Sequence, residues 1–167
     1  EWSDHGVEGS HKFLNRLWSA GYKINTLSDQ QDNINEQDEK KLKIITNKTI
    51  AKITADYGER VSLNTVVSSC MEMLNAINKS IQLETVCKEV IFESYKVLIL
   101  LLNPITPHIC KEIASELNIL DLDKDKSWPE IDRNFIKEDV ILMIIQVNGK
   151  VRKKIEVSAD ILQEELE

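Results

Sequence analysis

Glycine and proline are scarce in this chain, which has five glycines and three prolines among 167 residues. Phosphate-binding loops such as G-x-x-x-x-G-K-[ST] and G-x-G-x-x-G are built from glycine, and neither pattern occurs. Long apolar runs are missing too: the longest candidate, Val97–Leu102, is far shorter than the roughly 18 residues that span a bilayer. The sequence therefore excludes both loop types, and we expect no membrane association.

Cysteine is also rare, and Cys70, Cys87 and Cys110 are widely spaced. They form no C-x-x-C pair and have no histidine at metal-ligand spacing, which argues against zinc. We interpret them as buried thiols of a reduced, cytoplasmic protein. The chain opens on Glu1 without an initiator methionine or a secretory pattern, so we expect an excised piece of a longer protein.

Catalytic patterns are absent as well. His5, His11 and His108 are far apart, and none belongs to a nucleophile–base motif. His108 could act as a general base, but we favour a packing or hydrogen-bonding role at a helix start. We therefore expect no catalytic residue, metal or cofactor in this chain.

What the sequence does have is segregated charge. The net charge is -7, with 28 acidic and 21 basic residues. Residues 29–39 are acidic, whereas Lys40–Arg60 and Lys150–Lys154 are mainly basic. The local electrostatic field depends more on how charged residues cluster than on the net charge. An acidic chain can therefore still bind a polyanionic partner.

Helical spacing of apolar residues predicts an all-α bundle over residues 1–120. The first helix is expected to start near Ser3 or Asp4 and to stop at Gly21, a favourable C-terminal residue. The other four are expected at Glu36–Tyr57, Asn64–Lys79, Leu83–Leu102 and His108–Leu117.

Composition changes after residue 120. Residues 121–138 are polar and contain Pro129, which predicts a linker. Val140–Val147 and Lys150–Ser158 are predicted strands joined by an Asn-Gly hairpin turn. A helix is expected to begin near Asp160, so residues 139–167 are interpreted as part of a small, incomplete α/β domain.

Basic residues in helical register are candidate binding residues. Lys12 and Arg16 are four apart in the first predicted helix, and Lys48 and Lys52 are four apart in the second, so each pair projects from one side. Arg60 closes the second cluster. Each pair suits contacts to phosphate, but each equally suits an ordinary solvated helix surface.

The hairpin carries a third basic cluster. Strand alternation places Arg152, Lys154 and Glu156 on one face and Lys153 on the other, and Lys150 follows the turn. A polyanion contact is one interpretation of this cluster. The other is edge protection, because lysines on an exposed strand discourage pairing with other strands.

Several segments together resemble a known family. In chain order they are EWSDHGVEGSHKFLNRLW, NKTIAKITADYGERVSLNTVVSSCMEMLNAI, LLLNPITPHICKEI, SWPEID and IIQVNGKVRKKIEVSAD. They are similar to the C-terminal part of bacterial-type leucyl-tRNA synthetases, which are class I aminoacyl-tRNA synthetases. That part comprises an anticodon-binding-fold helical domain and the start of a C-terminal domain. The chain departs from the family pattern at Lys153, where glycine is usual, and at Ser158, where proline is usual.

The resemblance implies a segment that positions tRNA within an enzyme joining leucine to its tRNA with ATP. ATP with Mg and leucine would bind elsewhere in the parent enzyme. The implied partners are leucine tRNA and the catalytic and editing domains of the same chain, in a cytoplasmic monomer. Lys12 and Arg16 would contact the tRNA backbone, and Lys150 and Arg152 would contact or place its corner.

One alternative from another class is a helical protein–protein interaction module with no role in RNA binding. It predicts an exposed apolar groove and no salt-dependent affinity for RNA.

Overall fold

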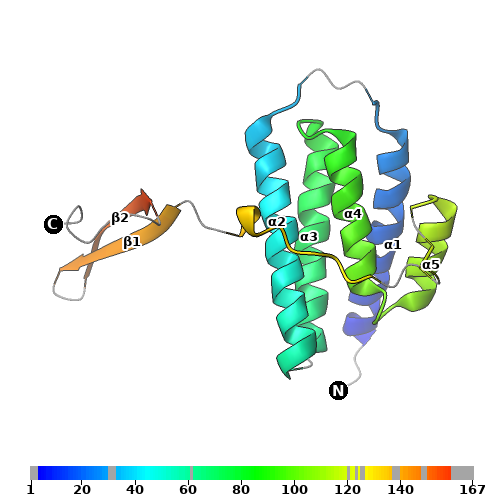
Figure 1. The fold of residues 1–167 in the computed structure, drawn as a ribbon. Coiled ribbons are helices and arrows are strands. Elements are labelled where there is room, and N and C mark those ends of the chain that lie inside the picture. The colour runs from blue at the N-terminus through cyan, green and yellow to red at the C-terminus, as the bar shows by residue number, and fades with distance from the viewer. Residues whose placement is uncertain are drawn as a thin grey trace. The chain divides into compact units, whose positions relative to one another are not determined.

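The computed structural model describes residues 4–29, 33–60, 62–119, 121–122, 124, 127–136, 140–147 and 150–158 (Figure 1). The chain divides into two compact units, Glu1–Asp132 and Arg133–Glu167.

The first unit is a bundle of five α-helices (Figure 1). They are α1 (Asp4–Thr26), α2 (Glu36–Ala55), α3 (Leu63–Leu83), α4 (Lys88–Leu102) and α5 (Pro107–Glu116), with the π-helix η1 (Asp56–Arg60) directly after α2. The prediction of a mainly helical bundle is confirmed. Among the described residues, no helix combines the length and apolar character needed to cross a bilayer.

The start of α4 is tied to the first turn of α2. The backbone N–H of Cys87, the residue before α4, donates to the Glu39 carboxylate at 3.0 Å. Hydrogen bonds from Cys87 lower the pKa of Glu39 below its ordinary value. A carboxylate here also interacts favourably with the positive end of the α4 dipole. The predicted start of this helix at Leu83 is wrong, because Leu83 is the last residue of α3 and Glu84 ends that helix in a left-handed conformation, so α4 begins at Lys88.

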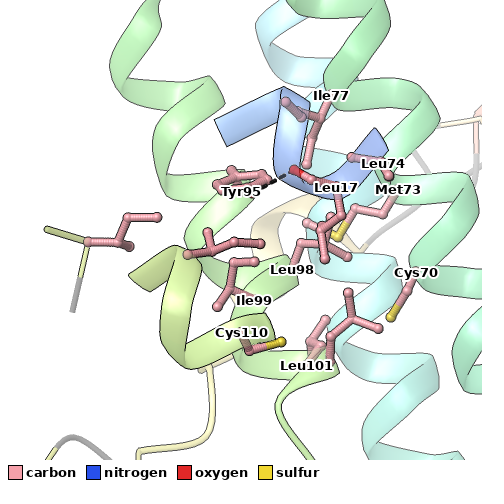
Figure 2. Packing of buried hydrophobic residues seen from close by; sticks show 14 of the residues in the cluster. Leu17, Cys70, Met73, Leu74, Ile77, Tyr95, Leu98, Ile99, Leu101 and Cys110 are labelled. Carbon is pink, nitrogen blue, oxygen red and sulfur yellow. Dashed lines mark hydrogen bonds between the residues drawn. The ribbon is translucent and has the colours of Figure 1, made fainter. Parts of the chain in front are cut away.

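The core lies where α4 packs against the other helices (Figure 2). Tyr95 of α4 is fully buried, and its Oη donates to the Leu17 backbone carbonyl of α1 at 2.8 Å. Cys70 and Cys110 are buried, and burial raises the pKa values of their thiols to about 12 and about 11. The described residues contain no group of His, Cys, Asp and Glu arranged to hold a metal ion.

Gly21 does not end the first helix, and that prediction is wrong. Helix α1 continues to Thr26, with Gly21 buried in its interior. A Cβ at this position would lie against Leu117 Cδ1 and 2.9 Å from Tyr95 Oη. Glycine is therefore present for the close approach of neighbouring side chains and not for a left-handed turn.

We predict that Gly21→Ala destabilises the bundle although alanine is the better helix former. Overpacking of a core lowers the free energy of unfolding by roughly 1–3 kcal/mol. The higher helix propensity of alanine offsets about 1 kcal/mol of that loss. The matched control is Gly9→Ala, because a Cβ there meets nothing within 4 Å. It should stabilise the protein by up to about 1 kcal/mol. Urea unfolding measures the change in free energy of unfolding for both variants. Equal changes for Gly21→Ala and Gly9→Ala would contradict the packing explanation.

Part of the predicted linker lies against α2 and η1. Trp128 Nε1 donates to Thr54 Oγ1 at 2.8 Å, and its ring meets that of Tyr57 edge-on with centroids 5.6 Å apart. The backbone N–H of Asp132 donates to Asn47 Oδ1 at 2.7 Å. Residues 127–132 therefore belong structurally to the bundle unit.

We predict that Trp128→Phe lowers the free energy of unfolding of the bundle by about 0.5 kcal/mol, because it removes the hydrogen bond to Thr54. This value is at the lower end of the range for a hydrogen bond, because the Trp128 residue is 38% exposed. Trp128→Ala should lose about 0.5–1.5 kcal/mol more by removing the ring pair. Urea unfolding followed by helical circular dichroism measures both changes. In a Thr54→Val background, Trp128→Phe should barely change the free energy of unfolding. If the change is as large as in the wild type, the hydrogen bond between Trp128 and Thr54 contributes nothing.

The second unit contains the 3-10 helix η2 (Arg133–Phe135) and two antiparallel strands, β1 (Val140–Val147) and β2 (Lys150–Ser158). A register shift lies between Ile145 and Gln146, which pair with Lys153 and Val151. One strict alternation therefore does not run the whole length of β2. The predicted Asn-Gly turn and the predicted helix from Asp160 lie outside the described residues.

Candidate nucleic-acid interface

Helix α1 has one buried side and one basic, exposed side. Its buried side chains are Phe13, Leu17, Ala20 and Ile24. The exposed side chains include Lys12, Arg16, Ser19 and Lys23. Spacings of three and four residues place them along one stripe of the helix. Burial of the apolar side therefore fixes the direction of the basic stripe.

Two of these cations have different partners. Lys12 Nζ pairs with Glu8 at 2.6 Å within α1, and both side chains are largely exposed. Arg16 donates from its guanidinium to Oδ1 of Asn75, which lies on α3. The carboxylate offsets the charge of Lys12, whereas the neutral amide holds Arg16 without offsetting its charge.

A groove of about 560 Å³ lies between α1 and α3. Helix α1 lines it with Asn15, Arg16, Ser19 and Lys23, and helix α3 lines it with Asn78, Ile81 and Gln82. The lining thus combines two cations, three carboxamides and one hydroxyl, and it includes no carboxylate. We call this feature the α1–α3 groove.

Helix α2 adds further cations. Lys48 and Lys52 are exposed, one turn apart, while the neighbouring Thr49 and Ile53 are buried. Two turns earlier in the helix, Lys41 pairs with Asp38 at 3.0 Å. The hydrogen bond from Lys41 lowers the pKa of Asp38 below its ordinary value.

Helix α3 packs against both α1 and α2. A smaller pocket of about 140 Å³ between α2 and α3 is lined by Lys41 and Lys79, and also by Asp38, which pairs with Lys41. This pocket therefore has mixed charge, unlike the α1–α3 groove.

The groove between α2 and α4 is different. It measures about 280 Å³ and is mostly apolar, with Val90 and Val97 in its lining. Glu89 and Glu93 face Lys43 around it. Its mixed charges give no preference for a polyanion, which makes the α1–α3 side the candidate interface.

The remaining predicted residues are not brought into this surface by the described structure. Arg60 is the last residue of η1, and its side chain lies outside the described part. On β2, Lys150 pairs with Val147 and Lys154 with Ile144, while Arg152 falls at the register shift. Their roles stay predictions.

Sequence reasoning missed the polar groove residues Asn15, Ser19, Lys23, Asn78 and Gln82, and it missed Asn75, the partner of Arg16. Lys23 was missed because the first helix was expected to end at Gly21, two residues earlier. Its spacing of seven from Arg16 was the available signal. The α3 amides gave no signal, since only the packing of α3 beside α1 places them next to cations.

Comparisons with known proteins identify the family of this chain. The family model described as "Anticodon-binding domain of tRNA ligase" matches residues 39–166. The leucine–tRNA ligase of Colwellia psychrerythraea is 38% identical over 178 residues, covering 100% of this chain and 20% of that protein. That of Pseudoalteromonas atlantica is 39% identical over 173 residues, with the same coverage. The chain thus spans about a fifth of the length of these relatives.

A solved structure has a similar fold. It is the ternary complex of Agrobacterium radiobacter K84 agnB2 LeuRS, tRNA and LeuAMS, with a TM-score of 0.77 and 21% sequence identity. The match covers 99% of this chain and 22% of that one. Because the family model matches most of the sequence, this chain belongs to the family of anticodon-binding domains of tRNA ligases.

Proposed function

We propose that this chain positions tRNA as the C-terminal portion of a leucine–tRNA ligase. The observation that carries the proposal is the α1–α3 groove, whose lining holds two cations and no carboxylate in a chain of net charge -7. Relatives at 38–39% identity along the whole chain are leucine–tRNA ligases, which supports this choice over a protein–protein module.

The proposed contacts are electrostatic and independent of RNA sequence. Lys12, Arg16, Lys48 and Lys52 would meet phosphates of the tRNA body, and Arg60 extends the α2 cluster. Lys150, Arg152 and Lys154 would contact or place the tRNA corner. Specificity would come from the shape of the folded RNA, since phosphate contacts carry no sequence information.

The parent protein would join leucine to its tRNA using ATP. We assign no catalytic residue and no cofactor to this chain, so ATP with Mg and leucine would bind to other domains of a cytoplasmic, monomeric enzyme. The catalytic and editing domains would be intramolecular partners. Within the chain, the proposed organisation is a bundle over 1–120, a linker over 121–138 whose residues 127–132 pack on the bundle, and a partial C-terminal domain over 139–167.

Affinity for a leucine tRNA transcript, measured against salt concentration, tests the proposal. Lys48→Ala/Lys52→Ala should make the log–log slope shallower by about 1.4–1.8, because each lost phosphate contact changes it by about 0.7–0.9. Lys12→Ala/Arg16→Ala should act similarly. Lys12 should supply the smaller part of that effect, because Glu8 already offsets its charge.

The control is Lys96→Glu on α4, which changes net charge as much as two Lys→Ala substitutions. Lys96 pairs with Glu93 and does not line the α1–α3 groove. The salt dependence of tRNA affinity should have the same log–log slope for Lys96→Glu as for the wild type. Equal slopes for all variants, or salt-independent binding by the wild type, would favour the interaction-module alternative.

A further inference from the structure

The α1–α3 groove is suited to a ligand that carries both anions and hydroxyl groups. Arg16 and Lys23 supply the positive charge, whereas Asn15, Asn78 and Gln82 supply neutral groups that donate and accept hydrogen bonds. An acidic peptide would use the cations but offers few hydroxyl groups to the amides. RNA backbone offers a phosphate and a ribose 2′-hydroxyl at each nucleotide.

The two cations are far enough apart to contact more than one nucleotide. Seven residues separate Arg16 from Lys23, which corresponds to about 10.5 Å along an α-helix. That distance lets the two side chains reach different phosphates of one RNA strand.

Asn75 holds Arg16 over the groove. Its Oδ1 accepts from the guanidinium, which has five N–H donors in a planar fork, so others stay available for a phosphate. Asn75 is neutral, so this contact orders the side chain while its full charge remains. Asn75 is thus a positioning residue, distinct from those that would touch the RNA.

The Asn78 amide is also oriented by the fold. Its Nδ2 donates to the Leu74 backbone carbonyl at 3.0 Å, one turn earlier in α3. That bond uses one N–H of the amide, and the amide oxygen can accept a hydrogen bond from a hydroxyl group. Gln82, one turn later, is exposed and lines the same groove. Two carboxamides therefore follow one another along the α3 wall.

We propose that the α1–α3 groove holds one stretch of RNA backbone, with Arg16 and Lys23 on phosphates and Asn78 and Gln82 on ribose 2′-hydroxyls. The inference rests on the proposed tRNA-positioning function and deepens it. It adds to that function a means of distinguishing RNA from DNA without reading bases.

The first test compares a leucine tRNA transcript with a deoxyribonucleotide strand of the same sequence. Asn78→Ala/Gln82→Ala should weaken tRNA binding about three- to tenfold and change DNA binding less than twofold, with the salt slope unchanged. Arg16→Ala/Lys23→Ala should make both slopes shallower by about 1.4–1.8. Equal losses on RNA and DNA for the amide variant would overturn the assignment of 2′-hydroxyl contacts.

The second test isolates the positioning role of Asn75. Asn75→Ala should weaken tRNA binding about two- to fivefold at an unchanged salt slope, because no charge is removed. In an Arg16→Ala background it should have no further effect. The control is Asn64→Ala, at an exposed position of α3 that does not line the groove. An equal effect of the control would refute the role.

Side-chain amide signals in NMR spectra separate the two levels of the proposal. Addition of the tRNA transcript should shift the signals of Asn75, Asn78 and Gln82. If tRNA binds with a salt-dependent affinity and these signals do not move, the groove assignment is wrong while the proposed function stands. If the wild-type chain shows no salt-dependent binding, both are overturned.

Discussion

The close contact between α1 and α4 is the constraint on which the rest of the surface depends. Tyr95 reaches the Leu17 carbonyl inside the core, and Gly21 leaves room for Tyr95 and Leu117 one turn later. A fixed rotation of α1 follows from these contacts, since a helix held at two successive turns cannot roll. Its basic stripe is therefore directed outward as a consequence of packing at its opposite side.

The second determinant is the choice of partners around each cation. Surface ion pairs contribute little stability, but they do change how much charge a surface presents. Lys12 and Lys41 face carboxylates, whereas Arg16 faces an amide. A neutral partner orders a cation and preserves its charge, so an acidic protein can keep a groove that is lined by cations and by no carboxylate. The count of acidic and basic residues carries no information about this arrangement.

The sequence predicted the parts that depend on local chemistry. Apolar periodicity predicted five helices, and a mainly helical bundle is observed. It failed where a residue serves a distant neighbour. Glycine is common at helix C-termini, but Gly21 lies inside α1 and leaves room for Tyr95 and Leu117. Asn75 has no local signal, because its partner Arg16 lies 59 residues away in the chain.

Segregated charge also bears on how a polyanion would approach. At ionic strengths near 0.15 M the Debye length is about 8 Å. An RNA would therefore interact mainly with the charges around the groove nearest to it, and the net charge of the chain would matter little. Glu89 and Glu93 beside the α2–α4 groove oppose an approach from that side, and the α1–α3 groove favours one. Under the proposed function, the acidic residues would raise the free energy of RNA encounters on the α2–α4 side, and the carboxylate-free groove would lower that of encounters on the α1–α3 side.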